Sequence, residues 1–145
     1  MTRWRFGWLL TAVLVTALPT TILVSASAKK LEANRALEPV YFDSGRTSGR
    51  PDDSRILDAH AAWLLRNLNR LLVVEGHTDG PGGNATSLAI GGQRATWAKE
   101  YLVSKGVDSD RIETIALGGD RPTCAERTAA CRANNRRTTF VTKER

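Results

Sequence analysis

The chain has 145 residues, a formal net charge of +6 at neutral pH and 41% hydrophobic residues. This length suffices for one hydrophobic core with a short leader, and it excludes a protein of several domains. A moderate positive charge suits an anionic polymer such as a cell wall, and also nucleic acid, so charge alone selects neither partner.

The first 28 residues have the layout of a secretory signal. Arg3 and Arg5 precede an uncharged, mostly apolar run over residues 6–24, and the small residues that follow predict cleavage after Ala28. The run approaches the roughly 20 residues that span a bilayer, so a retained anchor is the alternative. No cysteine follows the small residues, so a lipid-modified amino terminus is not expected. An exported chain is not expected to meet nucleic acid, and membrane contact is expected only if the segment is retained.

The polar residues 29–38 are expected to form a linker, and the folded domain is expected to cover residues 39–145. A first strand is predicted at 39–42, where a β-branched residue and two aromatic residues follow each other. The next eight residues, 43–50, have no periodicity and indicate a loop.

A helix is predicted next, opened by the proline and acidic residues at 51–54. Its apolar positions recur with the 3.6-residue period of a helix: Ile56, Leu57, Ala61, Leu64, Leu65 and Leu68. His60 lies beside this stripe and is interpreted as a residue at the edge of the core rather than a ligand-binding one. The apolar run 71–75, ended by Gly76, predicts a strand buried in a sheet.

A glycine-rich loop at 80–84 is expected to end at a helix cap, either Asn84 or Thr86. The second helix is predicted to continue to about Lys105 and to stop at Gly106. Two further glycines, Gly91 and Gly92, fall inside it. Each costs about 1 kcal/mol against alanine, so this part of the helix is expected to be either loose or packed closely against a neighbour.

A third strand is predicted at 111–117 and a last strand at 137–142, with a short helix as an option between them. The predicted order is therefore strand, helix, strand, helix, strand, strand. This order indicates an α+β sandwich with its helices on one face of the sheet.

Cys124 and Cys131 are the only cysteines, and in an exported protein two cysteines this close predict a disulfide that closes a short loop. A metal site is the competing interpretation. The two histidines, His60 and His77, lie far from both cysteines at no usual zinc spacing, so no metal and no cofactor are expected.

From residue 40 to the carboxyl end, the chain resembles the OmpA-like carboxyl-terminal domain shared by peptidoglycan-associated lipoproteins, OmpA and the flagellar stator protein MotB. The peptidoglycan-associated lipoproteins look closest, through residues 56–62. The matching segments, in family order, are 40–42, 56–61, 75–79, 93–95, 101–102, 105–107 and 135–137. The resemblance implies a βαβαββ sandwich with a mixed sheet, and a place in the periplasm or cell envelope of a Gram-negative-type bacterium. There the protein would be associated with the outer membrane or anchored by its amino-terminal segment.

By the same resemblance, the domain binds the diaminopimelate of peptidoglycan stem peptides without catalysis. Asp79 would hold the ligand's ammonium and Arg94 its carboxylate. Those side chains suit the task, since one is an acceptor-only anion and the other a planar cationic fork. Arg136 is either a second cation of the site or a partner in a surface salt bridge. The candidate set is completed by Thr78, Ser87 and Asp43. Backbone amides of residues 80–83 and of the helix start were further candidates for a carboxylate oxygen.

The sequence departs from the family pattern after the first strand, where Ser44 and Gly45 replace an expected aromatic and an acid. A wall of the pocket is therefore expected to be missing, which predicts weaker binding. At Ser87 the family commonly has an asparagine, which has a longer reach.

Other functions find less support. An enzyme would need paired carboxylates, a metal, or a nucleophile with its base, and Glu75 and Asp79 lie on one strand and its end. The loop at 80–84 lacks the lysine of a phosphate-binding loop. A stator role is disfavoured because residues 6–24 contain no acid to carry protons. The main alternative is a structural or interaction domain of the envelope that has lost ligand binding. Other envelope proteins remain possible partners.

Overall fold

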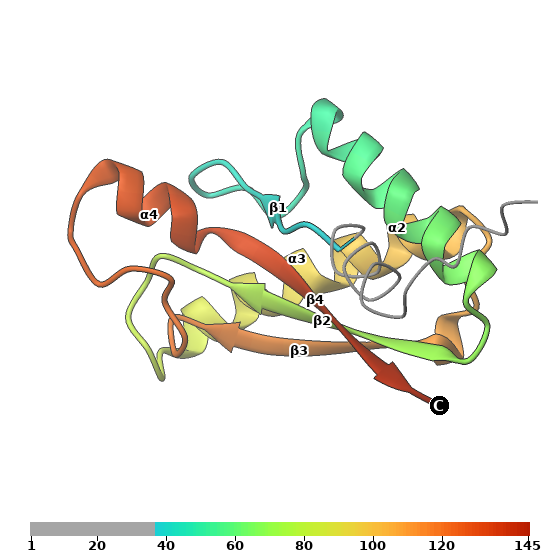
Figure 1. Ribbon diagram of the computed structural model, residues 1–145. Coiled ribbons are helices and arrows are strands. Elements are labelled where there is room, and N and C mark those ends of the chain that lie inside the picture. The colour runs from blue at the N-terminus through green and yellow to red at the C-terminus, as the bar shows by residue number, and fades with distance from the viewer. Residues whose placement is uncertain (1–36) are drawn as a thin grey trace, which may run out of the picture.

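The computed structural model describes residues 37–145, so the predicted signal segment and nearly all of the predicted linker lie outside the described residues. Seven helices and strands follow one another within this range (Figure 1): β1 (Val40–Tyr41), α2 (Ser54–Arg66), β2 (Arg70–His77), α3 (Ala85–Ser104), β3 (Ile112–Gly118), α4 (Ala129–Asn135) and β4 (Arg137–Glu144). Short 3₁₀ turns precede α2 at Pro51–Asp53 and β3 at Ser109–Arg111.

The four strands form one mixed sheet in the order β1-β4-β2-β3. β2 and β3 run parallel, as their connection through α3 requires, while β4 runs antiparallel to β2 and to β1. The helices α2 and α3 lie on the same side of this sheet, and α4 lies beyond the end where β2 and β3 finish (Figure 1). This is the α+β architecture that the order of elements predicts.

The core fills the space between that face of the sheet and the two helices. Its members alternate along the strands and follow one stripe of each helix: Val40, Phe42, Leu57, Ala61, Leu64, Leu72, Val74, Ala95, Ala98, Leu102, Val107, Ile112 and Phe140. Two predicted core positions are wrong, because Leu65 is 45% exposed and Leu68 is 68% exposed. α2 ends at Arg66, which leaves Leu68 in the following turn, and Leu65 lies on the solvent side of the stripe.

A close backbone contact explains the glycines inside α3. A Cβ atom on Gly91 would lie 2.6 Å from the carbonyl oxygen of Gly76 on β2, and a Cβ on Gly76 would overlap Gly91 in turn. Only two residues without side chains allow the helix to approach the strand this closely. Of the two alternatives for this part of the helix, the structure shows the tightly packed one.

The ends of α3 follow the predicted signals. The side chain of Asn84 accepts hydrogen bonds from the amides of Thr86 and Ser87, so it is the cap, and Gly106 takes a positive φ of 95° just after the helix.

The first strand is shorter than expected, and β2 and β4 extend two residues further than expected at their carboxyl ends. Within residues 37–145, no helix combines the length and the apolar character that crossing a bilayer requires.

The two cysteines form the expected disulfide, with their Cα atoms 5.7 Å apart. The loop that they close leads into α4, whose first turn is capped by the hydroxyl of Thr128 on the amide of Cys131. Asn135 ties the loop down from the other end of α4. Its side chain accepts from the amide of Thr123 at 2.8 Å and donates to the carbonyl of Cys124 at 3.0 Å.

His60 lies inside the core rather than at its edge. Its ring packs edge-on against Phe140, with the ring centroids 4.5 Å apart, and neither ring nitrogen has a hydrogen-bond partner within residues 37–145. Burial lowers the pKa of His60 to about 4. On the other face of the sheet, burial is also the main cause that lowers the pKa of His77 to about 4, assisted by Arg137 and opposed by Glu75.

We expect acid to destabilise the domain between about pH 6.5 and pH 4, because the unfolded chain then binds protons that the folded histidines refuse. Each histidine should lower the free energy of unfolding by about 2 kcal/mol at about pH 4.5 relative to pH 7. Replacing His60→Leu should remove about half of the total loss in the free energy of unfolding between pH 7 and about pH 4.5. Urea unfolding at both pH values measures it, and a variant whose pH dependence equals that of the parent would show that His60 is not the group responsible.

Removing the disulfide should lower the free energy of unfolding by about 2 to 3 kcal/mol, since the unfolded chain regains the freedom of a short loop. The double variant Cys124→Ser and Cys131→Ser is compared with the oxidised parent by denaturant titration. Alkylation before reduction, followed by mass spectrometry, reports the native state of the thiols. Two alkylated cysteines in protein taken from the periplasm would contradict the bridge.

Candidate functional site

The carboxyl ends of the two parallel strands, β2 and β3, place the candidate residues at one edge of the sheet. After β2 the chain is held by a hydrogen bond of 2.8 Å from the amide of Thr78 to the carbonyl of Gly118. The loops that follow the strands then touch, because a Cβ on Gly119 would overlap the carbonyl oxygen of Gly80. Asp79 lies at this junction, as polar residues at the carboxyl ends of parallel strands commonly do at binding sites.

Asp79 forms an ion pair with Arg136, in which Nη1 donates to Oδ2 at 2.9 Å. The same guanidinium donates from Nε to the carbonyl of Phe42 at 3.0 Å, which fixes it between the end of β1 and the Asp79 loop. The side chains are 26% exposed for Asp79 and 13% exposed for Arg136. The Oδ1 atom of Asp79 has no hydrogen-bond partner within residues 37–145.

Arg94 projects from α3 toward the same edge but is buried, with 1% of its surface exposed. Its Nη1 donates to the carbonyl of His77 at 2.8 Å and its Nε donates to the carbonyl of Arg46 at 2.9 Å. The guanidinium carbon lies 5.0 Å from the centroid of the Phe42 ring, as in a cation–π contact. Burial lowers the pKa of Arg94, and the nearby Asp79 carboxylate opposes this shift.

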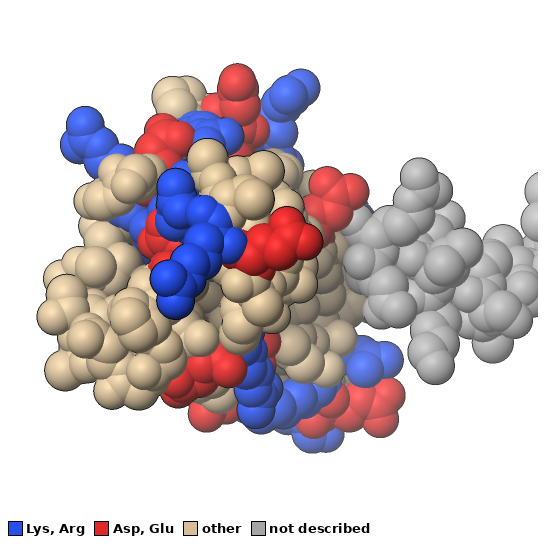
Figure 2. Space-filling view, turned by 90° about the vertical axis from the view of Figure 1, so that its left-hand side faces the viewer, with Lys and Arg blue, Asp and Glu red and all other residues tan. Residues whose placement is uncertain are grey.

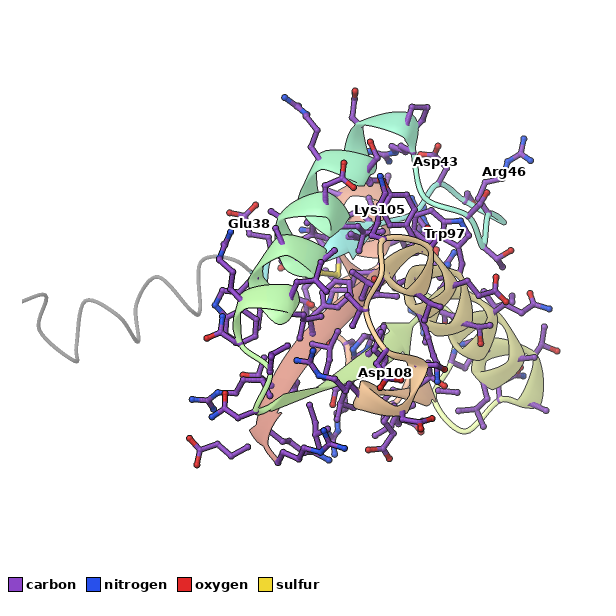
Figure 3. The ribbon with its side chains drawn as sticks, turned by 90° about the vertical axis from the view of Figure 1, so that its right-hand side faces the viewer. Glu38, Asp43, Arg46, Trp97, Lys105 and Asp108 are labelled. Atoms are coloured by element: carbon purple, nitrogen blue, oxygen red, sulfur yellow. A yellow bond between two sulfur atoms is a disulfide. The ribbon has the colours of Figure 1, made fainter. Side chains whose placement is uncertain are left out.

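Asp79 and Arg94 therefore do not meet in a direct ion pair within the described chain, and the basic partner of Asp79 is Arg136. The loop 43–50 separates Arg94 from solvent. Figure 3 shows Arg46 and Asp43 on the outer side of this loop and Trp97 beneath it. The loop is pressed onto α3 at Gly49, where a Cβ would collide with the ring of Trp97.

The other candidates occupy different surroundings. Asp43 is engaged by Arg50, which donates to its Oδ1 from Nε at 3.0 Å and from Nη2 at 2.6 Å. Thr78 and Ser87 are both buried next to Gly80, whose amide donates to the hydroxyl of Thr78 at 3.4 Å. The structure thus brings Thr78 and Ser87 to the Asp79 loop and ties Asp43 to its own loop.

The backbone amides expected to receive a carboxylate are partly occupied. The amide of Gly83 donates to Asp120 at 2.6 Å, and Asn84 takes the first free amides of α3. The expectation that the helix start offers these groups to a ligand is wrong for these positions. The side chain of Asn84 caps the helix and already accepts hydrogen bonds from the amides of Thr86 and Ser87.

A cavity of about 460 Å³ opens beside Asp79 and was not foreseen from the sequence. The β2–α3 loop forms one side of it, and the disulfide loop and α4 form the other: Asp79, Gly80, Gly119, Pro122, Cys124, Ala125, Glu126, Arg127, Arg132 and Asn135. Figure 2 faces this end of the molecule and shows basic and acidic side chains side by side on its surface. The only sequence signal for this second wall was the pair of basic residues in and just after the disulfide loop, Arg127 and Arg132.

Within the described residues, no group of three or more histidine, cysteine, aspartate or glutamate side chains is arranged to hold a metal ion. The geometry instead offers hydrogen-bond and ion-pair partners. These consist of the Oδ1 atom of Asp79, which has no hydrogen-bond partner within residues 37–145, the guanidinium of Arg136 bound to the same carboxylate, and the buried guanidinium of Arg94. Such a set can bind an ammonium and a carboxylate of one small molecule.

Comparison with known proteins gives concordant matches. Residues 41–136 match the OmpA family. The chain is 37% identical over 102 residues to a peptidoglycan-associated lipoprotein of Rhizobium meliloti, which covers 70% of this chain and 58% of that protein. It is 40% identical over 98 residues to the lipoprotein of the same name from Mesorhizobium japonicum, with coverage of 68% and 58%. The chain thus spans less than two thirds of the length of these relatives.

Solved structures agree with these matches. The crystal structure of the peptidoglycan-associated lipoprotein from Burkholderia pseudomallei superposes with a TM-score of 0.71 at 30% identity, covering 74% of this chain and 92% of that one. The carboxyl-terminal domain of Helicobacter pylori MotB superposes with a TM-score of 0.66 at 16% identity, covering 75% and 86%, and this shows the fold alone. The sheet, the helices and the matched residues together show that this chain belongs to the OmpA family.

Proposed function

We propose that the domain binds peptidoglycan non-covalently, through the diaminopimelate of its stem peptides, and links the protein to the cell wall without catalysis. One observation carries the proposal most directly. The Asp79 side chain is 26% exposed, its Oδ2 atom is held by Arg136, and its Oδ1 atom has no hydrogen-bond partner within residues 37–145. The names of the lipoprotein relatives support peptidoglycan as the polymer. A place in the periplasm or cell envelope is part of the same proposal.

Asp79 receives the ligand's ammonium, because a carboxylate is an acceptor-only group and Oδ1 is available. Arg136 receives the ligand's carboxylate from the position where it already contacts Asp79. Thr78 and Ser87 line the loop beneath and can supply hydroxyls. No step of this recognition forms or breaks a covalent bond.

The Nε atom of Arg94 can reach a ligand only if the carbonyl of Arg46 gives way. A carboxylate oxygen is a stronger acceptor for a guanidinium than a neutral carbonyl, so a ligand carboxylate can replace Arg46 on Nε. Such a replacement would move the loop 43–50, which carries Asp43 together with its partner Arg50. Arg94 then contributes in two ways, since it positions the end of β2 through His77 and joins the site after the loop has moved.

A second candidate function is a structural or interaction domain of the envelope that does not bind the stem peptide. The burial of Arg94 favours this second function, because the cation expected to bind the ligand is buried and its Nε atom already donates to the backbone carbonyl of Arg46. This candidate predicts a folded domain that fails to sediment with purified cell walls. The two functions are therefore separated by one assay.

We expect the parent protein to sediment with purified sacculi and Asp79→Asn to lose most of this binding. Removing one partner of a desolvated charge contact costs about 2 kcal/mol or more, which is about thirtyfold in affinity. Asp52→Asn is the matched control, since it makes the same chemical change on an exposed acid near α2. Thermal unfolding confirms that each variant is folded. Equal sedimentation of both variants would refute the assignment of Asp79, and absence of sedimentation of the parent would favour the second candidate.

Replacing Arg94→Ala should lower the free energy of unfolding by about 3 kcal/mol or more, because the buried carbonyl of His77 and the part-buried carbonyl of Arg46 lose their donor and Phe42 loses a packing partner. A binding defect of this variant therefore needs a stability measurement beside it. Denaturant titration of Arg94→Ala and of Arg55→Ala, an exposed arginine on α2, gives the comparison. A loss no larger than that of Arg55→Ala would contradict the structural role.

A further inference from the structure

The cavity beside Asp79 contains two guanidinium groups that the proposed head-group site does not use. Arg127 and Arg132 line it on the side of the disulfide loop and α4. Neither forms an ion pair with an acid within residues 37–145, and the one contact between them is a hydrogen bond of 2.7 Å from Arg132 to the carbonyl of Arg127. The carboxylates of Asp79 and Glu126 line the same cavity, and Asp79 is already paired with Arg136.

This charge arrangement defines the chemistry of an occupant. Guanidinium groups bind carboxylates through paired hydrogen bonds, and neither Arg127 nor Arg132 has an acidic partner within residues 37–145. The volume of about 460 Å³ is that of an ordinary ligand pocket, and it is shared with Asp79. An occupant of this cavity therefore carries a carboxylate close to the group that Asp79 binds.

The walls of the cavity are held in place by contacts that do not depend on a ligand. The disulfide closes the loop that carries Arg127, and Asn135 fixes the beginning of that loop to α4. On the opposite side, Gly119 lies against Gly80, and Asp120 accepts a hydrogen bond from Gly83. The two arginines are thus presented from a framework that keeps them at one side of the Asp79 loop.

We propose that Arg127 and Arg132 form a subsite for the free carboxyl terminus of the stem peptide, next to the diaminopimelate head group at Asp79. The inference rests on the proposed function. The head-group site alone disfavours stems whose ammonium is consumed, and the subsite adds selection against stems whose terminal carboxylate is consumed. Cross-linking of stems consumes the side-chain ammonium of one stem and the terminal carboxylate of the other. A site that holds both groups prefers stems that are not cross-linked.

Isothermal titration calorimetry with two synthetic peptides tests the subsite. Both peptides end in diaminopimelate followed by D-alanine, one with a free carboxyl terminus and the other with that terminus amidated. The parent should bind the free acid about threefold to tenfold more tightly, as expected for one or two partly exposed charge contacts. Raising the salt concentration should shrink this ratio.

The double variant Arg127→Gln and Arg132→Gln should bind the amidated peptide like the parent and bind both peptides equally well. Arg55→Gln, the same change on an exposed arginine of α2, should keep the ratio of the parent. A ratio near one in the parent would overturn the subsite and leave the proposed function standing. A ratio that survives in the double variant would overturn the assignment to these two arginines. If the parent binds neither peptide, the proposed function fails, and the subsite fails with it.

Discussion

The buried guanidinium of Arg94 is the interaction on which the geometry of the site depends. A cation inside a protein is costly unless its donors meet acceptors, and Arg94 finds its acceptors at the end of β2 and in the loop 43–50. The contact of Gly76 with Gly91 brings α3 close enough to β2 for this reach. One helix, one strand end and one loop are thereby fixed together. Asp79 and Arg136 are left as the partly exposed charged pair at that edge.

The fold could be predicted from the sequence because its signals are local. The helical stripe through Leu57, Ala61 and Leu64 and the stop at Gly106 each follow from neighbouring residues, and the structure confirms them. The prediction for Leu68 was wrong. This apolar residue continues the helical period, but the helix ends before it because the chain turns at Asn67. The choice between a loose and a tight helix at Gly91 depended on a strand fifteen residues earlier, so the sequence left it open.

The site was only partly predictable for the same reason. The motif around Asp79 named residues that the structure does gather at one edge of the sheet. The motif could not reveal which cation pairs with Asp79. Arg136 lies 57 positions from Asp79 in the sequence, and only the folded structure shows that Arg136, rather than Arg94, contacts this carboxylate. The hydrogen bond from Arg94 to the carbonyl of Arg46 could not be predicted from residue types, since every residue has a backbone carbonyl. The altered loop 43–50 was recognised as a departure, but its role as a cover was not.

The central claim is that Asp79 and Arg136 receive the diaminopimelate head group. A crystal structure of the domain with a stem peptide tests it most directly, because it locates the ammonium, the carboxylates and the loop 43–50 at once. We expect the ammonium within hydrogen-bond distance of Asp79 Oδ1 and a ligand carboxylate on Arg136. A peptide bound elsewhere, with the pair of Asp79 and Arg136 unchanged and Oδ1 left without a ligand contact, would contradict it.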